Sequence, residues 1–169
     1  HAAPLCRGRA DSAGQVSRDI LTIKGLIRRG EARTASSYNN IPLDRVHFLD
    51  LPFYETGKIQ KNPISEADVE IVRNLLREVK PHQIFVAGDL ADPHGTHRVC
   101  TDAVFAAVDL EKEEGAKWLK DCRIWMYRGA WAEWEIENIE MAVPISPEEL
   151  RAKRNSILKH QSQMESAPF

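Results

Sequence analysis

The 169-residue sequence lacks the features that mark several broad classes of protein. It has no apolar run long enough to span a bilayer, so we expect no membrane-spanning helix. Its cysteines, Cys6, Cys100 and Cys122, are widely spaced and form no C-x-x-C pair, which argues against a disulfide scaffold and a thiolate zinc site. The formal charge is only -2 and there is no long basic block, so nucleic-acid binding along the whole chain is disfavoured.

Several catalytic signatures are also absent. Without H-E-x-x-H, G-x-S-x-G, a Walker loop or G-x-G-x-x-G, the zinc-protease, acyl-serine, nucleotide-phosphate and dinucleotide classes have no motif support. Cys100 falls within a helical apolar pattern, which favours a buried structural thiol over a nucleophile. Hydrophobic residues make up 43% and charged residues 28%, and this composition at this length is typical of one globular domain.

The start of the chain is unusual. The first residue is His1, and residues 1–16 have no clear hydrophobic period. We therefore expect an irregular or displaced segment over 1–16 and one α/β domain over 17–169, within a longer chain. No signal-peptide pattern is visible, and the odd cysteine count fits a reducing compartment, so we expect a cytoplasmic protein.

Helical and extended patterns alternate along residues 17–169. Apolar spacing and capping residues predict helices that begin at 17, 65, 96 and 146, the last running to about 163. Short strands are predicted at 46–49, 84–87, 122–127 and 136–143. This alternation predicts an α/β sheet of mostly parallel strands. Ligands of such sheets bind where strands end and the chain turns into a helix, and the aspartate-bearing loops after Leu49 and Ala87 lie at such ends.

The stretch "GDLADPHGTHRV" after the second of these strands is the strongest candidate for chemistry. His94 and His97 are three residues apart at the start of a helix, and imidazole is a common zinc ligand, although H-x-x-H pairs also arise by chance. Asp89 and Asp92 could orient those rings or act as bases, and the alternative role of Asp92, which precedes a proline, is to close a turn. The sequence alone leaves both interpretations open.

Other polar and aromatic residues are weaker candidates. Asp50 and Tyr54 could bind a polyhydroxylated substrate or close their loop, and Arg28 and Arg29 could bind an anion or simply be solvated. The tryptophans of "WMYRGAWAEWE" could stack on a sugar, although packing explains them equally well. Three further histidines look structural or exposed: His47, His82 and His160.

In several segments the chain resembles the LmbE-like (PIG-L) zinc de-N-acetylases. "DPHGTHRV" is similar to the second motif of that family, "IRRGEA" to its Arg-x-x-Glu-Ala helix, and "KRNSILKHQSQ" to its last helix. "FLDLPFYETG", "AGDLADPHGTHRVC" and "YRGAW" are closer still to the LmbE-like domain joined to a glucosamine-6-phosphate deaminase domain in some bacterial proteins. Together these segments cover most of residues 23–163.

The resemblance implies a fold, a metal and a set of roles. It implies a Rossmann-like sheet of mostly parallel strands with helices on both faces, here lacking its first strand. It also implies one zinc ion held by His97, with His94 stabilising the oxyanion, Asp92 in a catalytic role, and an amino sugar or sugar phosphate as substrate. Arg28, Asp50, Tyr54 and Arg98 are the residues that would bind that substrate. A homo-oligomer is compatible with this interpretation, whereas nucleic acid and membrane are not expected as partners.

One family motif has no counterpart in this sequence. The first motif, Ala-His-Pro-Asp-Asp-Glu, supplies further metal ligands and the general base, and His1 is followed by Ala-Ala-Pro-Leu. Because a catalytic zinc site normally needs three protein ligands, we expect this chain to bind zinc weakly or not at all. Three functions follow as alternatives: a zinc-dependent deacetylase domain with part of its site missing, a non-catalytic domain that binds a sugar phosphate or a partner beside a deaminase, or a purely structural module with a polar loop.

Overall fold

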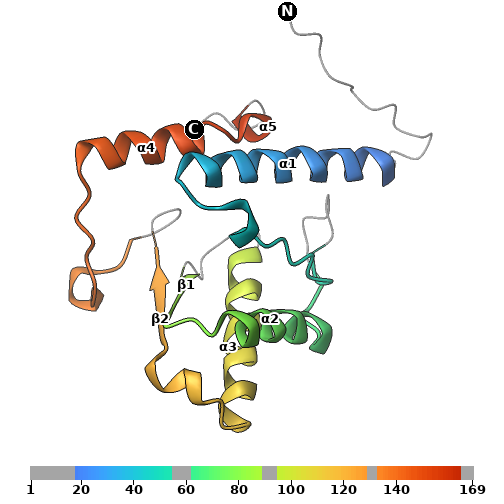
Figure 1. The fold of residues 1–169 in the computed structure, drawn as a ribbon, viewed down its shortest axis with the longest axis vertical. Helices are drawn as coiled ribbons and strands as arrows, with labels where there is room; N and C mark the ends of the chain where they lie inside the picture. Colours follow the sequence, from blue (N-terminus) through green and yellow to red (C-terminus); the bar gives the residue numbers. More distant parts are fainter. Residues whose placement is uncertain (1–17, 55–61, 89–94, 129–132, 165–169) are drawn as a thin grey trace, which may run out of the picture. The chain divides into compact units, whose positions relative to one another are not determined.

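The structure, a computed structural model, describes residues 18–54, 62–88, 95–128 and 133–164. The chain divides into two compact units: one from His1–Phe48 with Val143–Phe169, the other Leu49–Ala142. Helices and a parallel two-stranded sheet make this an α/β protein, as the sequence predicts (Figure 1). The expected segment over 1–16 lies outside the described residues.

The first unit is helical. It contains α1 (Arg18–Tyr38), η1 (Leu43–Arg45), α4 (Pro147–Ile157) and α5 (Gln161–Met164). The predicted first helix is therefore confirmed. The end of α1 is held to α4 by the side chain of Asn39, whose Nδ2 donates to the Ser156 hydroxyl at 2.7 Å.

In the second unit, α2 (Glu66–Val79) begins where the sequence predicts it. Ser65 is its N-cap, and the Asp68 carboxylate returns a hydrogen bond to the Ser65 backbone N–H, which completes a capping box. The helix ends at Lys80, which has a left-handed φ of 48°, and Pro81 prevents its continuation.

The sheet of the second unit consists of β1 (Gln83–Ala87) and β2 (Arg123–Tyr127), paired in parallel from Gln83 with Arg123 to Ala87 with Tyr127. Both strands were predicted. Parallel neighbours require a crossover, and α3 (Thr96–Glu113) with the short η2 (Lys117–Asp121) provides it. The β1–α3–β2 connection therefore places the carboxyl ends of both strands at one edge.

The core of this unit lies between α2 and α3 (Figure 1). Val72 and Leu76 of α2 pack against Ala103 and Ala107 of α3, and leucines from the segment before α2 pack against the same cluster. At the edge of this contact, the buried Glu111 carboxylate accepts hydrogen bonds from the Nε atoms of Arg73 and Arg77, both at 2.6 Å. Small residues on α3 allow the two helices to approach closely.

Two predicted strands do not form. Residues 46–49 follow η1 without regular structure, and the predicted strand at 136–143 begins instead as a 3-10 turn, η3 (Ile136–Asn138). Apolar alternation was the basis for both predictions, but a strand also needs a neighbour with which to hydrogen-bond, and in the described part of the chain only β1 and β2 pair. Ile136 is 86% exposed, so its apolar side chain does not mark a buried strand.

Two smaller expectations also need correction. The last predicted helix is broken between Ile157 and Gln161 into α4 and α5. Cys100, expected to be buried, is exposed, because the buried apolar positions of α3 begin one turn later, at Ala103. Among the described residues, no helix is both long and apolar enough to cross a membrane.

Candidate functional site

The carboxyl ends of β1 and β2 lie side by side at one edge of the sheet. The backbone N–H of Gly88, directly after β1, donates to the carbonyl of Tyr127 at 2.7 Å, so pairing continues one residue beyond the strand. The chain enters α3 at Gly95, whose φ of 68° is one that glycine adopts without strain. The intervening candidates Asp89, Asp92 and His94 lie outside the described residues.

Gly88 is buried, and the space around it admits no side chain. A Cβ at this position would lie 2.9 Å from the Cβ of Met126 and 2.9 Å from Cζ2 of Trp134. Real Cβ atoms do not approach other heavy atoms so closely. The first residue of the candidate loop is therefore required to be glycine by packing.

Arg128 and Trp134 build the other side of this edge. The Arg128 Nε donates to the Gly88 carbonyl at 3.1 Å, and its guanidinium lies over the Trp134 ring, 3.7 Å from the centroid. Trp134 is fixed in turn by its indole N–H, which donates to the carbonyl of Met126 at 3.0 Å. Sequence reasoning noted the tryptophan as a stacking or packing residue but did not single out Arg128; the signal was an arginine directly after a strand.

His97 and Arg98 lie in the first turn of α3, next to this edge. His97 is half-buried and Arg98 is exposed. The helix start is fixed to the sheet by Thr101, whose hydroxyl donates to the carbonyl of Ala87, the last residue of β1, at 2.8 Å. A ligand at the carboxyl end of β1 would therefore meet the start of α3 in a defined position.

Asp50 and Tyr54 lie on the segment that leads toward α2. The flanking Leu49 and Leu51 pack against the core, while Asp50 is exposed and has a left-handed φ of 50°. Tyr54 is also exposed, and its ring meets the ring of the fully buried Phe53 edge to face, with 6.2 Å between centroids.

The Asp68 carboxylate, which is fully buried, holds this segment to α2. Its Oδ1 accepts the backbone N–H of Phe53 at 2.8 Å, while Oδ2 accepts the N–H and the hydroxyl of Ser65. Burial by itself raises the pKa of Asp68, but the hydrogen bonds from Ser65 and Phe53 outweigh it and hold the pKa below its ordinary value. Sequence reasoning found the cap but not the second contact.

Arg28 belongs to the other unit, on α1, where it is exposed. Three residues later, Glu31 accepts the backbone N–H of Ser162 at 2.6 Å and its hydroxyl at 2.7 Å. Burial raises the pKa of Glu31, but the two hydrogen bonds from Ser162, together with the nearby His160 and Arg28, bring it below its ordinary value. Two segments quoted for the family resemblance, "IRRGEA" and "KHQSQ", are thus joined by Glu31 and Ser162.

The described residues do not by themselves supply a metal-ligand set. Over 18–54, 62–88, 95–128 and 133–164 there is no group of three His, Cys, Asp or Glu side chains arranged to hold a metal ion. Desolvation raises the pKa values of Cys100 and Cys122, which disfavours the thiolate form of both side chains. His97, the metal ligand that the family resemblance implies, falls within the described ranges.

Comparison with known proteins identifies the relatives of this chain. It is 99% identical over 153 residues to a protein of Bacteroides thetaiotaomicron named "Putative glucosamine-6-phosphate deaminase-like protein". That match covers 90% of this chain but 23% of the relative, so the chain spans about a quarter of its relative's length. No solved structure matches the chain. Residues 1–108 match the family described as PIG-L, GlcNAc-PI de-N-acetylase, and the chain belongs to the PIG-L family.

Proposed function

We propose that the chain is part of a hydrolase that removes the acyl group from an N-acetylglucosamine-type amino sugar. Membership of the PIG-L family supports the reaction class. The name of the Bacteroides relative, which refers to glucosamine 6-phosphate, supports an amino-sugar phosphate as substrate. The finer fold in this proposal is a Rossmann-like sheet with helices on both faces, and the proposed location is the cytoplasm.

The observation that carries the proposal is the edge formed by β1, β2 and the start of α3. Parallel strands end there beside a helix N-terminus, which is the position where α/β proteins bind small ligands. Thr101 and Arg128 hold the main chain on either side of that position, through the carbonyls of Ala87 and Gly88. His97 enters from α3 and is the residue we assign to a metal.

When bound in such a site, zinc acts as a Lewis acid toward the amide carbonyl of the substrate. His97 would be one of its ligands, and the described residues alone do not complete the set. Of the chain's own groups, we assign His94 to stabilise the negative charge that develops on the carbonyl oxygen, and Asp92 to a supporting proton-transfer or orienting role. Asp50, Tyr54 and Arg98 are the proposed substrate contacts within the same unit, and the role of Arg28, on α1, stays a prediction from the sequence.

A second function, of another class, has the support of the relative's name. A domain that only binds a sugar phosphate beside a deaminase would use the same edge without hydrolysing an amide. The two functions differ in a measurable product, because amide hydrolysis releases acetate and an amine, whereas binding releases neither.

The test uses the full-length Bacteroides relative, with zinc content and acetate release from N-acetylglucosamine 6-phosphate measured on the same preparation. We expect about one zinc ion per chain, as in a single catalytic site, and we expect acetate release. The variant His97→Ala should lose both the bound zinc and the acetate release. The matched control is His82→Ala, an exposed histidine in the turn before β1. A folded protein without zinc that binds glucosamine 6-phosphate but releases no acetate would overturn the hydrolase and support the binding function.

A further inference from the structure

A groove of about 930 Å³ lies along the α2–α3 pair, within the second unit. Its apolar lining comes from both helices and from the residue before the α2 cap: Ile64, Val69, Ala106 and Leu110. On α3 the lining residues recur at intervals of three and four, from Asp102 to Glu113, so they form one stripe of the helix. That stripe is about 17 Å long, which is three turns of an α-helix.

Both rims of this groove are acidic. Glu66 and Glu70 line it from α2, and Asp102, Asp109 and Glu113 line it from α3. The described residues that line the groove include no lysine or arginine. The Glu70 carboxylate forms ion pairs with Arg73 at 3.6 Å and with Arg77 at 3.7 Å. Within the described chain, the α3 carboxylates at the other rim form no such ion pair. An occupant must therefore offer an apolar stripe flanked by positive charge.

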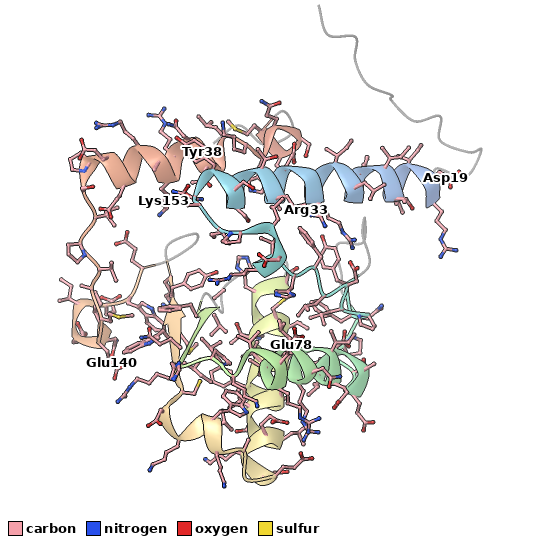
Figure 2. The ribbon with its side chains drawn as sticks, viewed as in Figure 1. Asp19, Arg33, Tyr38, Glu78, Glu140 and Lys153 are labelled. Atoms are coloured by element: carbon pink, nitrogen blue, oxygen red, sulfur yellow. The ribbon has the colours of Figure 1, made fainter. Side chains whose placement is uncertain are left out.

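The same chain contains a helix with those properties. On α1, Ile23, Leu26 and Ile27 are 56%, 61% and 45% exposed, although they lie on one face at helical spacing. Lys24 and Arg28, one turn apart and both exposed, border this apolar face. Arg33, labelled in Figure 2, lies farther along α1. Its guanidinium carbon is 5.7 Å from the centroid of the Phe48 ring.

We propose that α1 of one copy of this chain docks in the α2–α3 groove of a second copy. The apolar face of α1 would cover the groove floor, and Lys24 and Arg28 would meet the acidic rim formed by Asp102 and Asp109. Laying an amphipathic helix in a groove is an established mode of recognition, and exposed apolar side chains are the driving force for it. Each copy has one helix and one groove, so in the dimer that we propose each α1 lies in the groove of the other copy, and both contacts are made. The proposal does not depend on the proposed hydrolase activity.

The test measures the dimer dissociation constant of the 169-residue chain by sedimentation velocity, with two charge-reversed variants. The groove variant is Asp102→Lys with Asp109→Lys, and the helix variant is Lys24→Glu with Arg28→Glu. Each puts like charges at the contact, so we expect each to raise the dissociation constant at least about tenfold. The matched control, Glu137→Lys with Glu140→Lys, changes charge by the same amount as the groove variant on exposed residues outside the groove, and should leave dimerisation unchanged.

Mixing the two variants is the decisive measurement. The reversed α1 of the helix variant is then complementary to the reversed groove of the other chain, and the second contact joins the two unaltered surfaces. A mixed dimer should therefore form where neither variant dimerises alone, and raising the salt concentration should weaken the unaltered dimer. If α1 bound the groove of its own chain, or if another partner filled the groove, mixing would restore nothing.

Three results would overturn the proposal: a monomer at every concentration up to about 100 μM (roughly the weak limit for specific association), reversals without effect, or a mixture that stays monomeric. Circular dichroism verifies that each variant retains its helices. If a double variant loses its helices, a single substitution takes its place: Asp109→Lys for the groove variant or Lys24→Glu for the helix variant. The expected results are the same.

Discussion

Arg128 and Trp134 lie face to face at the carboxyl edge of the sheet, with the guanidinium carbon 3.7 Å from the indole centroid. The arginine also donates to the Gly88 carbonyl and the indole to the carbonyl of Met126. These contacts close one side of the edge and determine how much room remains beside Gly88. The packing of the edge can therefore be tested at that glycine.

Gly88→Ala should destabilise the chain by about 1–3 kcal/mol, the usual result of inserting a methyl group into a filled space. The added Cβ would meet Met126 and Trp134 at 2.9 Å, so the strand end or the indole must move. Urea unfolding followed by tryptophan fluorescence measures the loss.

The control for this change is Gly30→Ala on α1, where nothing lies within 4 Å of an added Cβ. Replacing a glycine inside a helix by alanine should stabilise the chain by about 0.5–1 kcal/mol. Equal stabilities for the two variants would contradict the packing described around Gly88.

Asp68→Asn should lower stability by about 1–3 kcal/mol at neutral pH, because the buried carboxylate accepts hydrogen bonds from Ser65 and Phe53. An amide can keep some of them, but one of its two ends is a donor. Urea unfolding near pH 7 measures the difference. The segment with Asp50 and Tyr54 should also exchange its amide hydrogens faster.

The same residue gives a pH dependence with a definite sign. Since the folded pKa of Asp68 is depressed, its stabilisation is fully present above the unfolded value of about 3.9 and is lost as the pH falls through the folded value. The stability difference between the unaltered chain and Asp68→Asn should thus be constant above about pH 5 and shrink in stronger acid. A difference independent of pH down to pH 2 would contradict this account.

A second capping box provides a matched control. On α4, Ser146 and Glu149 exchange the same two hydrogen bonds, but Glu149 is exposed. Among the described residues it makes no contact comparable to that of Asp68 with Phe53. Those bonds from Ser146 lower the pKa of Glu149. Glu149→Gln should therefore cost clearly less than Asp68→Asn in the same urea experiment, because water replaces the lost partner.

The parts of the fold that local sequence determines were predicted well. Both capping boxes, the starts of α2 and α4 and the end of α2 before Pro81 follow from side chains within a few residues of the backbone groups they bind. β1 and β2 were also predicted, since each is a short apolar run next to a helix pattern. Residues 46–49 and 136–143 have similar patterns without forming strands, because pairing depends on residues distant in sequence.

At the candidate site, too, local features were predicted and contacts between residues distant in sequence were not. Sequence reasoning identified the loop after β1 and placed His97 at the start of α3, both of which are local features. It did not identify the Arg128 contact with Gly88, 40 residues away, or the Glu31 contact with Ser162, 131 residues away. No periodicity or cap connects such pairs. The role of Arg28 stays a prediction. The roles of the other candidate residues are proposals: His94, Asp92, His97, Asp50, Tyr54 and Arg98.

The charged cluster between α2 and α3 gives the last prediction. Glu111, 4% exposed, accepts hydrogen bonds from the Nε atoms of both Arg73 and Arg77, and its loss would leave two guanidinium groups at the helix contact without that acceptor. The neighbouring Glu114 raises the pKa of Arg73, as does Glu111, so Arg73 stays charged at any pH at which the chain folds. Glu111→Ala should therefore cost about 1–3 kcal/mol in urea unfolding, the usual result of losing hydrogen bonds at a buried site, because Glu114 still pairs with both arginines.

Replacing both Arg73 and Glu111 separates the net value of their ion pair from the cost of removing Glu111 alone. The double variant Arg73→Met with Glu111→Leu removes the buried charges together and fills similar volume, so it should recover most of the stability lost in Glu111→Ala. Recovery would mean that the ion pair adds little net stability to the contact between α2 and α3. A double variant as unstable as Glu111→Ala would instead show that the hydrogen bonds to Glu111 themselves hold the two helices together.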